Sequence, residues 1–72
     1  MTKFEKEKQI NRFVIMCVQQ YAEFSNMSGS EAYKEMQKYK IIDELENDYE
    51  DLHGFSTIWL NDYIESLIRH RQ

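Results

Sequence analysis

Apolar residues recur along most of the chain at intervals of three and four, a spacing that places them on one side of an α-helix. The pattern is interrupted by polar residues at 25–28, by a change of phase at 39–40 and by a glycine-containing segment at 53–56. It predicts four amphipathic helices, at 4–24, 29–39, 41–52 and 57–70. Such helices can bury their apolar stripes only against one another, so we expect one small domain over 1–72, a compact all-α bundle.

The predicted helix ends carry recognisable signals. Ser28, followed three residues later by Glu31, is a capping box that predicts a helix start at Gly29. Ser56 is expected to cap the last helix. Gly54 is expected to adopt the left-handed conformation that closes the third helix.

The first predicted helix has more apolar residues than one stripe requires. Ile15 and Met16 lie outside the stripe, which predicts either a central helix with several neighbours or an interface formed by self-association or partner binding. The stripe itself comprises Ile10, Phe13, Val14, Cys17, Val18, Tyr21 and Phe24.

The other three predicted helices each have one apolar face. The second groups Ala32, Tyr33, Met36 and Tyr39; the third groups Ile41, Ile42, Leu45, Tyr49 and Leu52; the fourth groups Leu60, Tyr63, Ile64 and Leu67. Ile58 lies opposite the face of the fourth helix. These faces are expected to form the rest of the core.

Acidic residues are concentrated in the third predicted helix. Its phase places six carboxylates away from the apolar face: Asp43, Glu44, Glu46, Asp48, Glu50 and Asp51. Residues 1–40 have 7 basic and 5 acidic side chains (+2), and residues 41–72 have 2 and 8 (−6), which sum to the net charge of −4. Two interpretations remain open: a docking face for a basic surface on another protein, or a solvated face that maintains solubility.

Candidate catalytic and metal-binding groups are sparse. His53 lies beside Glu50 and Asp51, but a nucleophile–base pair needs a third group and a pocket, and Ser56 is expected to act as a helix cap. His53 is expected to end a helix, and Cys17 is expected in the core. The carboxylates do not match a calcium loop. We therefore predict no catalytic residue, no metal, no cofactor and no enzymatic activity.

Charge and cysteine content bear on compartment and partner. The negative charge disfavours nucleic acid as a ligand. A single cysteine, an N-terminus without an export signal and apolar runs of at most six residues predict a cytoplasmic protein that does not enter a membrane.

Several blocks along the chain resemble a known family. They are Phe13-Val14 to Tyr21, Met27 to Tyr33, Tyr39 to Asp43, Tyr49 to His53, and Trp59 to Ile64. These blocks, in this order, resemble those of a family of short, all-helical bacterial proteins described only as a domain of unknown function. Lys40 stands where that family often has glycine, and the loop at Gly54 to Ser56 is shorter than usual.

The resemblance implies no catalytic residues. It implies that some members are encoded beside a protein with an ADP-ribosyltransferase-like fold, which suggests a toxin's partner or an accessory subunit. We therefore predict a non-enzymatic protein–protein interaction module. The alternatives are a small acidic inhibitor that imitates nucleic acid, and a helix-turn-helix regulator that would bind DNA through its basic N-terminal residues Lys3, Lys6, Lys8 and Arg12.

Overall fold

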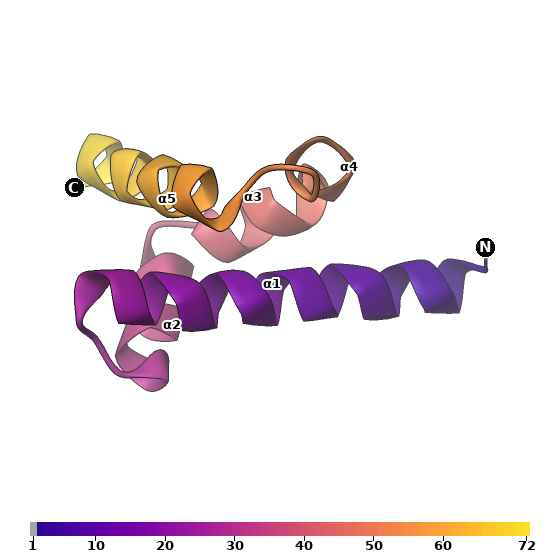
Figure 1. The fold of residues 1–72 in the computed structure, drawn as a ribbon, viewed down its shortest axis with the longest axis horizontal. Helices are drawn as coiled ribbons and strands as arrows, with labels where there is room; N and C mark the ends of the chain where they lie inside the picture. The colour runs from indigo at the N-terminus through magenta and orange to yellow at the C-terminus, as the bar shows by residue number, and fades with distance from the viewer. Residues whose placement is uncertain (1) are drawn as a thin grey trace.

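The computed structural model describes residues 2–72, which contain five helices and no strand (Figure 1). The helices are α1 (Lys3–Ser25), α2 (Gly29–Lys38), α3 (Ile41–Asn47), α4 (Tyr49–Leu52) and α5 (Thr57–Arg71). The predicted all-α bundle is confirmed, and three of its four helices agree with the prediction to within one residue at each end. The third predicted helix is divided into α3 and α4.

The division falls at Asp48, whose backbone (φ −102°, ψ 18°) belongs to neither helix. Acidic residues surround this point, and negative charge at a helix C-terminus opposes the helix dipole. Glu46 and Glu50 are also separated by four residues, where like charges destabilise a continuous helix. The local charge therefore favours an interruption that the apolar period does not reveal.

The predicted N-terminal caps are confirmed, but the predicted role of Gly54 is wrong. The Ser28 hydroxyl accepts from the Glu31 amide at 3.1 Å, the Glu31 carboxylate accepts from the Ser28 amide at 3.0 Å, and Ser56 caps α5. Neither glycine has a positive φ. Because α4 ends in right-handed geometry at His53, its C-terminal turn needs no left-handed residue. The left-handed positions are Asn26 (φ 57°), which closes α1, and Lys40 (φ 64°), at the corner between α2 and α3.

The core forms around α1, which contacts α2, α3 and α5. Of the two alternatives for the first helix, the structure shows a central helix with several neighbours, but Ile15 and Met16 themselves remain exposed; the placement of Cys17 in the core is confirmed. Figure 1 shows α3, α4 and α5 on one side of α1, whereas α2 begins on the other side and crosses the C-terminal half of α1 to meet α3. The buried apolar residues are Phe13, Val14, Cys17, Val18, Tyr21, Ala22, Ala32, Met36, Ile41, Leu45, Leu52, Leu60, Ile64 and Ile68.

Several positions differ from the predicted core, among them Ala22, which is buried although it is not part of the predicted stripe. Phe24 and Tyr33 lie on predicted apolar faces but are 46% and 43% exposed, and the polar residue Asn61 is buried. Periodicity gives the direction of a side chain around its helix, but it does not show whether a neighbouring helix covers that direction at a given height. Ile58, in contrast, is exposed, as expected from its position opposite the apolar face of its helix.

Candidate interaction surfaces

The six predicted acidic residues do not form one solvated arc. Asp43, Glu46, Asp48, Glu50 and Asp51 are exposed, but Glu44 is half-buried against α5. The prediction that all six face solvent is therefore wrong for Glu44. The reason is tertiary, because α5 packs against α3 on the side where Glu44 emerges.

Glu44 is held by two residues of α5. The Arg71 guanidinium donates to Glu44 Oε1 at 2.7 Å, and the Tyr63 hydroxyl donates to Oε2 at 3.0 Å. Arg71 also donates to the carbonyl oxygen of Tyr39 at 2.8 Å. The hydrogen bond from Arg71 is the main cause that lowers the pKa of Glu44. Burial, together with the bond to Glu44, raises the pKa of Tyr63 to about 12.

Glu50 is also engaged within the chain. Lys6 Nζ of α1 lies 2.8 Å from Glu50 Oε1, and both side chains are largely exposed. The hydrogen bond from Lys6 lowers the pKa of Glu50. Within residues 2–72, the remaining four carboxylates have no cationic side chain within 4.0 Å. We call these four, Asp43, Glu46, Asp48 and Asp51, the acidic surface.

Ile15 and Met16 are both exposed, at 56% and 37%, but they belong to different surfaces. Ile15 borders a groove between α1 and α2, whereas Met16 borders a hollow between α1 and α4. Consecutive helical residues point about 100° apart. The two residues therefore lie on opposite flanks of the α1 core stripe, and the structure does not combine them into one patch.

The groove between α1 and α2 has a volume of about 210 Å³ and is lined by Val14, Ile15, Val18, Gln19, Gly29 and Tyr33. All six residues are uncharged. The hollow beside Met16 has a volume of about 280 Å³ and a more polar lining that includes Arg12 and His53. There Tyr49 packs edge-on against Phe13 and stacks on the His53 ring, with centroids 5.4 and 4.7 Å apart.

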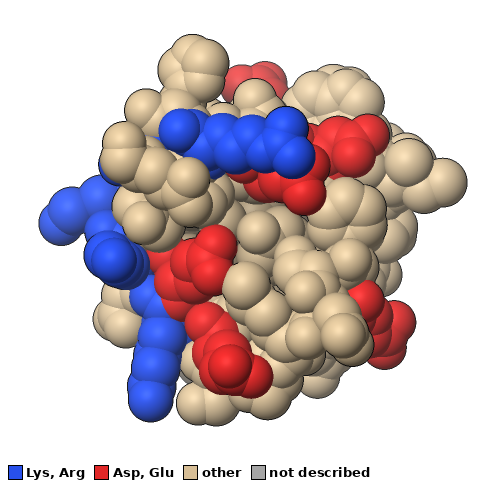
Figure 2. Space-filling model, turned by 90° about the vertical axis from the view of Figure 1, so that its left-hand side faces the viewer, with Lys and Arg blue, Asp and Glu red and all other residues tan. Residues whose placement is uncertain are grey.

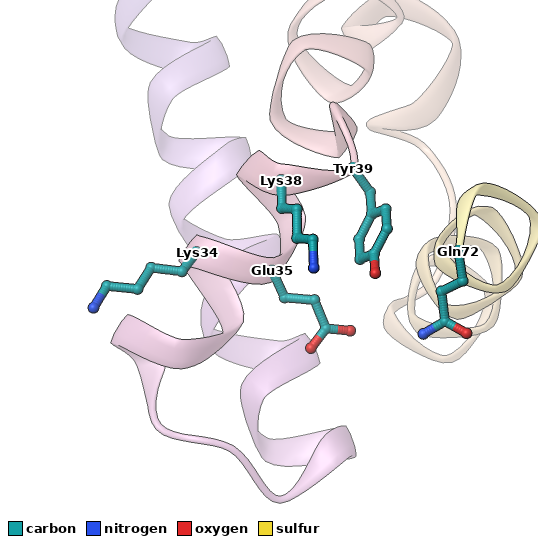
Figure 3. A pocket seen from close by; sticks show the side chains of 5 residues that line it. All are labelled: Lys34, Glu35, Lys38, Tyr39 and Gln72. Atoms are coloured by element: carbon teal, nitrogen blue, oxygen red, sulfur yellow. The ribbon is translucent and has the colours of Figure 1, made fainter.

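A third hollow lies between α2 and the end of α5 (Figure 3). Tyr39 and Gln72 form one side of it, Glu35 and Lys38 project from α2, and Lys34 points away from the other four side chains. Figure 2, which views the molecule from the left-hand side of Figure 1, shows basic side chains beside acidic ones rather than a surface of one sign. This end of the molecule therefore has mixed charge.

Aromatic rings also stack along α5. Phe55 and Trp59 have centroids 3.9 Å apart, Trp59 and Tyr63 have centroids 5.1 Å apart, and the rings are within 17° of parallel in both pairs. The first two side chains are 45% and 40% exposed. Sequence phase did not reveal this stack, although the spacing of four residues between the aromatics is a signal that could have done so.

The candidate chemical groups occupy structural positions. Cys17 is 1% exposed, and burial raises the pKa of its thiol to about 12, which leaves it protonated and unreactive at neutral pH. His53 caps the C-terminus of α4, as expected, with Nδ1 2.9 Å from the Tyr49 carbonyl oxygen. In the described part of the chain, no three side chains of His, Cys, Asp or Glu are grouped as a metal site would require.

None of the helices in residues 2–72 combines the length and apolar character needed to cross a membrane. No curated protein and no solved structure matches the chain significantly. A family model does match, over residues 12–71, which is most of the chain and includes α2 to α5 and the packed part of α1. The chain belongs to the family described as Protein of unknown function (DUF3791).

Proposed function

We propose that this protein is a non-enzymatic protein–protein interaction module of the bacterial cytoplasm, and that its acidic surface binds a basic surface on a partner protein. The observation that carries the proposal is the set of four exposed carboxylates, Asp43, Glu46, Asp48 and Asp51, that lack a cationic neighbour within residues 2–72. Charge of one sign on one surface accelerates and orients encounter with a surface of the opposite sign.

The contact between Lys6 and Glu50 supports this proposal from within the chain. The Lys6 ammonium group already lies 2.8 Å from the carboxylate of Glu50, the residue that precedes Asp51 in the chain. A lysine or arginine of a partner would make the same kind of contact with the neighbouring carboxylates. Since these side chains are exposed, such contacts cost little desolvation and contribute mainly to the association rate.

The two side chains best suited to catalysis, Cys17 and His53, occupy positions that support a binding function rather than a catalytic one. Cys17 is buried with a raised thiol pKa, and His53 stacks on Tyr49 with one ring nitrogen at a helix carbonyl. A nucleophile and its base must lie within hydrogen-bond reach of each other and of a substrate. Cys17 and His53 instead stabilise the core and a helix end.

The family resemblance suggests the class of partner. A neighbouring protein with an ADP-ribosyltransferase-like fold would be bound by this chain as its restraining partner or accessory subunit. The helix-turn-helix alternative receives less support, since α3, the helix that would enter the major groove, has acidic residues in its first turn.

The test is affinity purification of the tagged chain from its native cell, followed by mass spectrometry. The test variant combines Glu46→Gln, Asp48→Asn and Asp51→Asn. It omits Glu50, which pairs with Lys6, and Glu44, which pairs with Arg71. The control variant combines Glu7→Gln, Glu23→Gln and Asp62→Asn, three exposed acids elsewhere, so both variants change the net charge equally, from −4 to −1.

We expect a basic partner to be retained by the parent and the control and lost from the test variant. Equal recovery of the partner by both variants would contradict the proposal. If the partner is a nucleic-acid-binding protein and duplex DNA displaces the chain from it, the function is that of an acidic inhibitor.

A further inference from the structure

The groove between α1 and α2 differs from the other two hollows described above because its lining contains no charged residue. Its floor is formed by Val14 and Val18 of the core, and its walls include Ile15 and Tyr33, which are 56% and 43% exposed. In a chain with 31% charged residues, an uncharged groove with exposed apolar walls is a feature typical of interfaces.

A further exposed apolar residue of α1, Phe4, lies toward the start of the helix, separated from Ile15 by the polar residues Lys8 and Asn11. Phe4 precedes Ile15 by eleven residues, which is three helical turns plus about 20°. The two side chains therefore lie on nearly the same line along the helix, and Phe4 is 65% exposed. α2 crosses only the C-terminal half of α1 (Figure 1), and Lys8 and Asn11, which lie between Phe4 and Ile15 on this line, are exposed.

Gly29 keeps the groove open. A Cβ atom added at this position would have no other atom within 4 Å, and its backbone does not have a positive φ. Neither packing within the chain nor backbone conformation therefore requires glycine here. A side chain at Gly29, the first residue of α2, would instead project into space that is now available to another molecule.

The patch contains both a protruding group and a hollow. Ile15 stands at the edge of the groove, and the space beside Gly29 lies within it. A two-fold interface between identical chains requires this combination, because each copy must supply both the inserting group and the site that receives it.

The charge distribution also favours a second copy of this chain as the molecule that occupies the groove. A chain of net charge −4 repels a second copy of itself, most strongly where acidic surfaces meet. The acidic surface belongs to α3, α4 and Asp48 between them, which lie on the other side of α1 from the start of α2, where Gly29 borders the groove (Figure 1). Contact through the α1/α2 groove therefore keeps the two acidic surfaces apart and leaves both accessible.

We propose that two copies of this chain form a dimer about a two-fold axis near Ile15, with Ile15 of each copy inserted beside Gly29 of the other. The inference rests on the shape and charge of this groove and does not depend on the proposed binding of a basic partner.

The test is sedimentation velocity of the full chain over a concentration series extending into the millimolar range. The test variants are Ile15→Glu and Gly29→Leu. The first introduces a charge into the interface, and the second fills the hollow that would receive Ile15. The matched controls, Met16→Glu and Ile58→Glu, add the same charge at exposed apolar residues outside the groove.

We expect a dimer for the parent and both controls, and a dissociation constant at least about 100-fold higher for Ile15→Glu and Gly29→Leu, because a buried uncompensated charge and a filled hollow both oppose association. Circular dichroism shows whether each variant is folded. If Ile15→Glu is unfolded, the dissociation constant of Gly29→Leu tests the proposed dimer.

Four results would overturn the proposal. They are a monomeric parent at millimolar concentration, dimers that persist in both test variants, dissociation caused by a control variant instead, or assembly into open chains larger than a dimer. If the parent is monomeric and Ile15→Glu abolishes recovery of a partner protein, the groove serves that partner and the self-association proposal fails.

Discussion

Arg71 and Glu44, 27 positions apart in the chain, are joined by a 2.7 Å ion pair that ties the end of α5 to α3. Arg71 also donates to the Tyr39 carbonyl oxygen, at the end of α2. One side chain therefore connects three helices. About a third of each paired side chain is exposed, so the pair is partly shielded from solvent without being deeply buried.

We predict that Arg71→Ala lowers the free energy of unfolding by about 1 kcal/mol, because it removes charge-assisted hydrogen bonds that link distant segments. The matched control is Arg69→Ala. Arg69 forms a more exposed pair with Glu65 of its own helix, at 3.3 Å, and its loss should cost less than about 0.5 kcal/mol. Urea denaturation of both variants measures the difference. Equal losses would mean that the contacts of Arg71 contribute no more than a surface pair.

The same pair makes stability depend on pH. The pKa of Glu44 is lowered in the folded state, so the folded chain binds fewer protons at this site than the unfolded chain. Its contribution to stability is full above the unfolded-state pKa, near 4.5, and is lost as pH falls through the lower folded-state value. Glu44→Gln should therefore reduce the slope of stability against pH below about pH 5. Thermal melts from pH 7 to pH 3 provide the measurement, with Glu65→Gln as the control. An unchanged slope would contradict this role.

Val14→Asp should unfold the domain. Val14 is 8% exposed, and a carboxylate placed there would have to be buried without a partner. We expect a loss of at least about 3 kcal/mol, which is a large fraction of the stability of so small a domain. Ile58→Asp introduces the same group at a residue that is 77% exposed and should change stability by less than about 0.5 kcal/mol. Circular-dichroism melts compare the two variants, and similar melts would contradict the core assignment.

Lys40→Gly should leave stability unchanged or raise it by up to about 1 kcal/mol. Lys40 has φ 64°, a left-handed conformation that costs most residues more than it costs glycine. The gain is limited by the greater flexibility of glycine in the unfolded chain. Lys34→Gly, within α2, should instead cost about 1 kcal/mol. Urea denaturation of both variants tests the opposite signs, and destabilisation by both would show that the Lys40 side chain matters more than its backbone.

Neutralising the acidic surface should affect stability and binding in opposite directions. The variant with Glu46→Gln, Asp48→Asn and Asp51→Asn loses repulsion between neighbouring carboxylates, so it should be as stable as the parent or slightly more stable at low salt. Its association with the co-purified partner should be slower and less dependent on salt, while dissociation changes less. Surface plasmon resonance at two salt concentrations measures both rates. Equal rates and salt dependence for variant and parent would identify the acidic surface as a solvated face.

The order and bounds of most helices could be predicted from the sequence because their determinants are local. The Ser28 and Ser56 caps are confirmed because a hydroxyl three residues before an amide needs no distant partner. The burial of Cys17 and Val14 could be predicted because both residues lie on the apolar stripe of the first helix, and this stripe faces the core. Ile15 and Met16 lie outside the apolar stripe, as their phase indicated, but the sequence left open whether a neighbouring helix covers them; both are exposed.

The positions decided by tertiary structure are those where one helix meets another. Periodicity could not show that Glu44 faces α5, that Arg71 crosses from α5 to α3, or that Phe24 and Tyr33 remain exposed. It also could not separate Ile15 and Met16 onto different surfaces, or place Gly29 in a groove beside Ile15. Sequence pattern fixes the angle of each side chain about its own helix axis, whereas the packing of the helices determines what lies opposite that side chain.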